Sequence, residues 1–184
     1  MTVRRTLLIG LVLCLAIAAG CQQAPSADTP EGSAMLLAEA AEGADWTGMR
    51  TYMDAEAVGL VFAESLLATL PGQDSSPGAA ASPDMHGDGF PSGAMQETFA
   101  RQFVETLQAA AEDGTVVAEG TLLGTLLEDG VGEIEYVGDD EALVSVTVPA
   151  EGGDQTVQLR MRRTGQRWML VAVQGTTDLY EIFF

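Results

Sequence analysis

The chain has 184 residues and a formal net charge of −19 at pH 7, with 27 acidic side chains, eight arginines and no lysine. An acidic surface of this kind repels nucleic-acid phosphates and anionic lipid headgroups, so nucleic-acid binding is excluded as a function. Hydrophobic residues make up 47% of the chain, which is enough for a buried core and argues against wholesale disorder.

The first twenty residues have the pattern of an export signal. Arg4 and Arg5 are followed by an uninterrupted apolar run from Leu7 to Ala19. A membrane-spanning helix needs roughly 20 apolar residues, and this run is shorter. A basic start, a short apolar run and small residues at its end are typical of a signal peptide. We therefore expect residues 1–20 to be a signal peptide.

The apolar run ends in Ala18-Ala19-Gly20-Cys21, which resembles the lipobox of bacterial lipoproteins. In that family a diacylglyceryl group is attached to the cysteine thiol, and a peptidase cuts just before the cysteine. The resemblance implies cleavage between Gly20 and Cys21, and attachment to a membrane through palmitate-type chains on Cys21. Two alternatives stay open: an ordinary signal peptide, whose cleavage Ala16-Ile17-Ala18 could direct, and an uncleaved anchor.

Cys21 would be the only cysteine left after cleavage, because Cys14 lies within the expected signal peptide. The mature domain is thus expected to have neither a disulfide nor a thiolate metal site. In Gram-negative lipoproteins, aspartate after the cysteine favours the inner membrane. Here that residue is Gln22, so the resemblance implies the periplasm-facing side of the outer membrane if the source is Gram-negative.

Residues 21–32 are polar and contain two prolines, which indicates a tether between lipid and domain. Helical patterns follow. Strong helix formers fill residues 33–42, and Asp45 is a plausible N-cap for a helix over residues 46–53. Residues 55–70 and 93–113 place apolar side chains at three- and four-residue steps. We expect helices over residues 33–42, 46–53, 55–70 and 93–113, and a helical or mixed segment over 116–127.

Residues 71–93 are dense in proline, glycine and serine and poor in apolar bulk, so we expect a flexible insert there. A loop of this length within a domain is usually either functional or disordered.

The C-terminal part is rich in β-branched residues and is divided by turn-forming sequences. Strands are predicted over residues 132–137, 142–148, 156–163 and 167–174. Alternation of apolar and polar residues predicts an antiparallel sheet with one buried face. We therefore predict a single α+β domain over residues 33–184, with N-terminal helices packed on one face of a C-terminal antiparallel sheet of about four strands.

Two motifs carry a family resemblance. They are Asp45, Trp46, Arg50, Tyr52 and Asp54 in the helical half, and Arg162, Arg163, Gly165, Arg167 and Trp168 in the last hairpin. This arrangement resembles the cystatin-like and nuclear-transport-factor-2-like folds, which many bacterial lipoproteins of unknown function share. The insert at 71–93 departs from that plan. The resemblance supplies no catalytic residue.

Folds of this type often have an open pocket between sheet and helices. Trp46, Tyr52, Phe62 and Trp168 could line such a pocket, or could belong to the core. Another candidate site is basic: Arg160 and Arg162 share one face of a strand and could contact an anion or a partner. The alternative is that they pair with the surrounding acidic side chains.

Clustered acidic residues are the remaining candidates. His86 lies between Asp84 and Asp88, a set that could bind a divalent ion, but the sequence offers no second histidine. The consecutive carboxylates of residues 139–141 are expected to lie in a solvated turn. We therefore predict no metal site, no cofactor and no catalytic residue.

Taken together, these patterns predict a non-enzymatic cell-envelope protein that is lipid-anchored at Cys21 and binds an envelope protein or a small ligand. The alternative is a small-molecule pocket protein, or an unusual enzyme of the nuclear-transport-factor-2-like fold.

Overall fold

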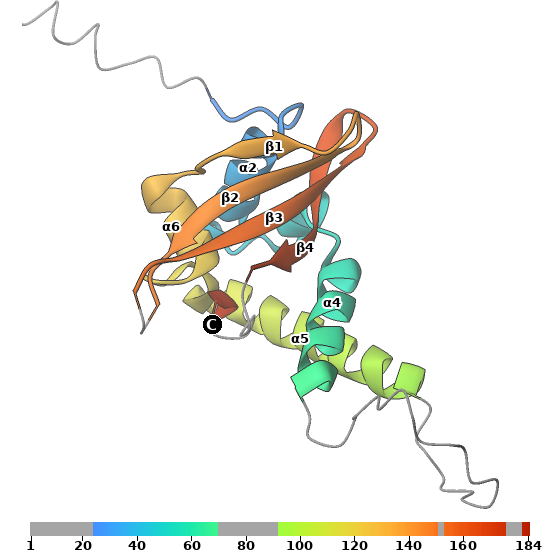
Figure 1. Ribbon diagram of the computed structural model, residues 1–184. Coiled ribbons are helices and arrows are strands. Elements are labelled where there is room, and N and C mark those ends of the chain that lie inside the picture. The colour runs from blue at the N-terminus through green and yellow to red at the C-terminus, as the bar shows by residue number, and fades with distance from the viewer. Residues whose placement is uncertain (1–23, 70–91, 151–152, 176–181) are drawn as a thin grey trace, which may run out of the picture.

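The computed structural model describes residues 24–69, 92–150, 153–175 and 182–184 (Figure 1). Within these ranges, five α-helices and one short 3₁₀-helix come first along the chain, and four strands follow. Helices before strands, with the strands in one antiparallel sheet, confirm the predicted α+β class.

The first helix, α2 (Pro30–Glu42), begins three residues before the predicted start at residue 33. Thr29 caps it, because its hydroxyl oxygen accepts a hydrogen bond from the Gly32 amide at 3.0 Å. Pro30 occupies the first turn, where a missing amide hydrogen costs nothing. The folded domain therefore begins inside the segment 21–32 that was expected to be a tether.

The next helices match the predicted positions closely. α3 (Trp46–Tyr52) is capped by Asp45, whose carboxylate accepts a hydrogen bond from the Gly48 amide at 2.9 Å. α4 (Ala55–Thr69) and α5 (Ser92–Asp113) pack against each other, and a Cβ at Gly59 would lie 2.8 Å from the Ala100 carbonyl oxygen. Glycine therefore allows the close approach of these helices.

The predicted insert at 71–93 lies outside the described residues except at its end, where Ser92 already begins α5. The segment predicted as helical or mixed forms a 3₁₀ turn, η1 (Thr115–Val117), and helix α6 (Leu122–Asp129). Thr121 caps α6 by accepting the Gly124 amide at 3.1 Å.

The sheet is an antiparallel meander in the order β1-β2-β3-β4. Its strands are β1 (Ile134–Tyr136), β2 (Glu141–Val148), β3 (Gln155–Thr164) and β4 (Arg167–Gln174). Val146 pairs with Val157, and alternate residues of β2 and β3 are buried as the sequence predicts.

Strand β4 departs from simple alternation. Leu159 pairs with Val173, but Met161 pairs with Leu170, so β4 carries one extra residue at this point. Such a bulge bends a strand and changes the faces of the residues around it, which accounts for the continuous burial of residues 170–173. On its other side, Leu170 forms a parallel bridge to Met53, and its carbonyl accepts the Asp54 amide at 2.9 Å.

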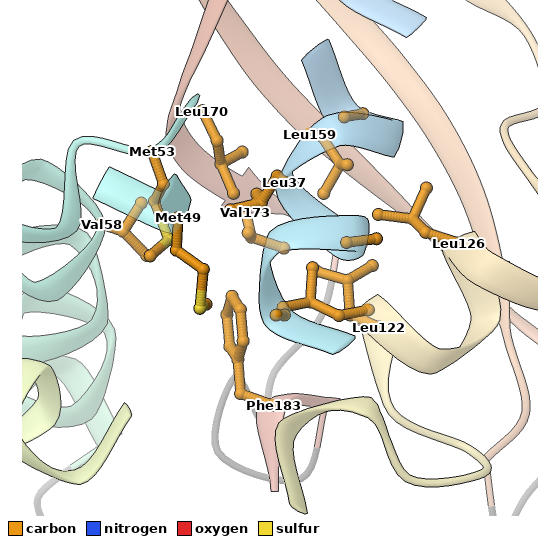
Figure 2. Close-up of a cluster of buried hydrophobic side chains, with 14 of the residues drawn as sticks. Leu37, Met49, Met53, Val58, Leu122, Leu126, Leu159, Leu170, Val173 and Phe183 are labelled. Carbon is orange, nitrogen blue, oxygen red and sulfur yellow. The ribbon is translucent and has the colours of Figure 1, made fainter. Parts of the chain in front are cut away.

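The core lies between the sheet and the helices, with α2 against the sheet's inner face (Figures 1 and 2). Leu37 of α2 and Leu159 of β3 are fully buried in it, as is Phe183 near the C-terminus. Phe183 also meets Phe103 of α5 edge to face at a centroid distance of 5.6 Å, and Phe103 stacks on Phe62 of α4 at 4.6 Å.

Candidate functional site

Three segments meet at one end of the sheet: the β1–β2 turn, the β3–β4 turn, and residues 24–29 at the start of the described chain. We call this region the hairpin end. The Asp140 carbonyl accepts the Arg163 amide at 2.8 Å, which joins the two turns. The rings of Tyr136 and Trp168 meet edge to face at 6.0 Å, so side chains of the first and last strands are in contact here although the strands are not neighbours in the sheet.

Trp168 fastens the start of the chain to β4. Its backbone amide donates to the Ala27 carbonyl at 3.2 Å and to the Ser33 hydroxyl oxygen at 3.3 Å. Its indole Nε1 donates to the Asp28 carbonyl at 3.1 Å, and the Ser33 hydroxyl donates to Ala27 at 3.0 Å. The side chain is only 3% exposed, so these bonds are shielded from competing water.

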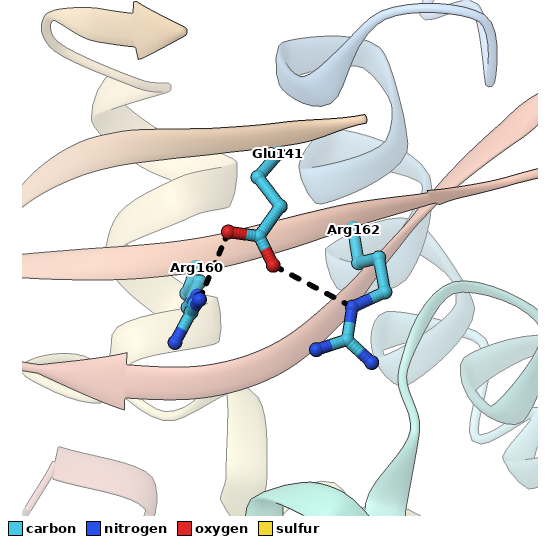
Figure 3. Close-up of polar contacts among 3 residues, drawn as sticks. All are labelled: Glu141, Arg160 and Arg162. Atoms are coloured by element: carbon cyan, nitrogen blue, oxygen red, sulfur yellow. Dashed lines mark hydrogen bonds and ion pairs between the residues drawn. The ribbon is translucent and has the colours of Figure 1, made fainter. Parts of the chain in front are cut away.

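Glu141 joins the two candidate arginines (Figure 3). Its Oε2 lies 2.8 Å from Arg160 Nη2, and its Oε1 lies 3.7 Å from Arg162 Nε. The hydrogen bond from Arg160 lowers the pKa of the Glu141 carboxyl, burial opposes this change, and the charges of Arg160 and Arg162 also lower the pKa. The intramolecular pairing that the sequence left open is therefore present, although the side chains of Arg160 and Arg162 remain 41% and 56% exposed.

Arg163 and Arg167 flank the same β3–β4 turn and are exposed. Among the described residues, neither takes part in a recorded ion pair. Beside them, Tyr136 and Val137 are each 59% exposed, the highest values for large hydrophobic side chains in the described ranges. The sequence pattern does not single out these two residues, because alternation alone does not distinguish an exposed apolar pair at a strand end from a buried one.

The four aromatic residues proposed for a pocket do not surround a common cavity. Trp168 lies at the hairpin end, while Phe62 stacks on Phe103 between α4 and α5. Trp46 and Tyr52 are partly buried and pack against the core, as Phe62 does. None of the four lines a groove recorded in the described part of the chain.

A groove open to solvent lies along α2, between residues 24–29 and Val131. Its volume is about 810 Å³. Met35 and Leu127 contribute apolar surface, and three exposed carboxylates line it: Asp28, Glu31 and Glu39. Exposed carboxylates at ordinary helix positions do not provide the buried polar groups that position a small ligand.

The remaining candidates are located as follows. Gly20, Cys21 and the His86 region with Asp84 and Asp88 lie outside the described residues. Residues 139 and 140 are exposed in the β1–β2 turn, as expected. Over the ranges that the structure describes, no group of three or more histidine, cysteine or acidic side chains could hold a metal ion, and no helix is long and apolar enough to cross a membrane.

Comparison of the chain with protein-family models, with curated proteins and with solved structures finds no match. The resemblance to cystatin-like and nuclear-transport-factor-2-like domains thus stays a prediction, and functional inference depends on the chain's own residues.

Proposed function

We propose that the protein is a lipid-anchored component of the bacterial cell envelope, attached through Cys21, and that it acts by binding a partner or ligand rather than by catalysis. The observation that carries this proposal is the order of segments at the N-terminus: a basic start, an apolar run and Ala18-Ala19-Gly20-Cys21. With Gln22 after the cysteine, the favoured location is the periplasm-facing side of an outer membrane.

The start of the fold is compatible with this attachment. Residues 27 and 28 are held by Trp168, so the domain begins only a few residues after Cys21. Two acyl chains on one cysteine give stable attachment, because each buried methylene contributes about 0.8 kcal/mol. A domain that starts immediately after such an anchor remains close to the bilayer surface.

The non-enzymatic part of the proposal is supported by composition. The whole sequence has one histidine, and Cys21 is the only cysteine after residue 14. General acid–base and nucleophilic catalysis most often use these two residue types. The buried polar side chains Ser33, Thr121 and Thr125 lie at helix starts, where Ser33 and Thr121 bond to nearby backbone groups.

The alternative, a small-molecule pocket protein or unusual enzyme, would need a cavity between sheet and helices. Trp46, Tyr52, Phe62 and Trp168 instead pack against the core, and the groove along α2 is open. These observations favour binding through an exposed surface.

Metabolic labelling with radioactive palmitate tests the proposal. The full chain is produced in a Gram-negative host, with Cys21→Ala as the test variant and Cys14→Ser as the matched control. The unmodified chain and Cys14→Ser should incorporate label and separate with the membrane fraction, because Cys14 lies within the expected signal peptide.

Cys21→Ala should incorporate no label. Equal label in Cys21→Ala and the unmodified chain, or none in either, would show that Cys21 is not a lipid attachment site. Label incorporation is decisive, because an uncleaved signal peptide can hold a chain in the membrane fraction without lipid.

A further inference from the structure

The distance between the lipid and the domain is short. Ser26 lies five positions after Cys21, and an extended chain spans at most about 3.6 Å per residue. From Ser26 onward the chain is held to the domain, since Ala27 and Asp28 accept hydrogen bonds from Trp168. A lipid on Cys21 therefore keeps Ser26 within about 18 Å of the bilayer and Asp28 within about 25 Å.

The hairpin end surrounds this attachment point. Trp168 contacts both residues 27–28 and the ring of Tyr136, and the Arg163 amide bonds to the β1–β2 turn. In Figure 1, residues 24–29, the end of β1 and the β3–β4 turn lie along the same side of the molecule, away from α5 and the C-terminus.

The hairpin end also has the side chains that suit a lipid surface. Tyr136 and Val137 are exposed, and tyrosine favours the membrane–water interface because its ring is apolar and its hydroxyl polar. Four of the six arginines that follow Cys21 lie in β3 and β4, and three of these, Arg162, Arg163 and Arg167, lie at this end. Four carboxylates lie at the same end: Asp28, Asp139, Asp140 and Glu141. Glu141, the first residue of β2, already neutralises charge on Arg160 and Arg162.

The negative charge on the rest of the molecule also favours an orientation with the hairpin end toward a lipid surface. Removal of residues 1–20 takes away two arginines and no acid, so the net charge falls from −19 to −21. Anionic headgroups repel the acidic surfaces and attract exposed arginines within a Debye length. At the hairpin end, Arg162, Arg163 and Arg167 nearly balance four carboxylates, those of Asp28, Asp139, Asp140 and Glu141. This end is therefore close to neutral, and a bilayer repels it less than it repels the strongly acidic remainder of the domain.

We propose that the hairpin end faces the lipid surface, with Tyr136, Val137, Arg163 and Arg167 at the headgroups, so that α4 and α5 point away from the membrane. The proposal rests on the lipid attachment proposed above, and it adds which face of the domain is hidden and which is presented to partners.

Site-specific fluorescence quenching tests this orientation. Once Cys21 is lipidated, an introduced cysteine carries the only free thiol of the mature chain. Gln166→Cys in the β3–β4 turn and Glu105→Cys on α5 are both at exposed positions. Each full-length protein is labelled with a fluorescent maleimide and reconstituted into vesicles of phosphatidylethanolamine and phosphatidylglycerol that contain a headgroup-nitroxide lipid. Flotation reports attachment, and quenching reports the distance to the headgroups.

We expect the probe at 166 to be quenched and the probe at 105 to be unaffected. Reversing two charges with Arg163→Glu and Arg167→Glu should reduce quenching at 166 without loss of flotation. Arg101→Glu on α5 is the matched charge control and should change nothing. Circular dichroism checks that each variant is folded.

Two results would overturn the inference in distinguishable ways. Equal quenching at 166 and 105 in a protein that floats would reject the orientation and leave lipid attachment intact. A chain without an introduced cysteine that reacts with maleimide and does not float would reject both.

Discussion

Two ends of the molecule are stabilised by different interactions. At one end, which we call the aromatic end, the rings of Phe62, Phe103, Phe183 and Phe184 pack together, with Phe103 in contact with each of the others. At the hairpin end, hydrogen bonds from Trp168 and ion pairs to Glu141 connect segments that are far apart in the sequence. One end relies on apolar burial and the other on polar contacts.

Because of this difference, one end should mainly determine the stability of the fold and the other the point at which the chain leaves the domain. A buried aromatic side chain contributes several kcal/mol, whereas an exposed ion pair contributes about 1 kcal/mol or less. The aromatic end should therefore carry much of the free energy of unfolding. The hairpin end should determine where the chain leaves the domain, and hence which face the proposed lipid anchor turns toward a membrane.

The largest effect is expected from Phe183→Ala at the aromatic end. Phe183 is fully buried, so removal of the ring leaves a cavity and should lower the free energy of unfolding by about 3–5 kcal/mol. Urea unfolding followed by circular dichroism measures this change. Phe184→Ala is the matched control and should cost clearly less, because Phe184 is only partly buried. Equal losses would show that the aromatic end does not depend on burial of Phe183.

A smaller effect is expected from Trp168→Phe at the hairpin end. The ring remains apolar, but the bond from Nε1 to the Asp28 carbonyl is lost, which should cost about 1–2 kcal/mol. Hydrogen exchange should also become faster in a peptide covering residues 24–32, because the start of the chain is held less firmly.

Trp46→Phe provides the control for this substitution, since it changes the other tryptophan, at the start of α3. It should leave exchange in residues 24–32 unchanged. The same exchange in Trp168→Phe and the unmodified protein would mean that the indole bond does not fasten the segment.

The smallest effect is the pH dependence from Glu141. The Arg160 hydrogen bond lowers the pKa of this carboxyl from its ordinary value of 4.5. The pair therefore stabilises the fold fully above pH 4.5, and this contribution is lost as the pH falls through the lowered pKa. Glu141→Gln should thus show a slightly smaller loss of Tm on acidification than the unmodified protein. Asp139→Asn controls for removal of a charge in the same turn, and an identical Tm profile for Glu141→Gln and the unmodified protein would argue against the pair.

Local patterns predicted much of the fold. Asp45 was recognised as a helix cap because a capping side chain bonds only to amides two or three residues away. Alternation in β2 and β3 predicted the buried valines because the sheet has one covered face. These features depend on residues that are neighbours in sequence.

Features that depend on distant contacts could not be predicted. Phe183 belongs to a segment too short to show periodicity, yet it fills the space beside Phe103. The bulge in β4 could not be predicted from a glycine, because β4 contains none. The bond between Trp168 and Asp28 joins residues 140 positions apart, so the start of α2 was placed too late and the expected tether was too long.

The bridge between Met53 and Leu170 has a consequence for how the protein behaves among its copies. An unpaired strand edge is a template for joining another chain and starting aggregates. The outer edge of β4 is interrupted because Leu170 already bonds to residues 53 and 54, and the opposite edge strand, β1, is only three residues long. Within the described residues, neither border of the sheet offers a long free edge, so neighbouring copies can remain separate molecules.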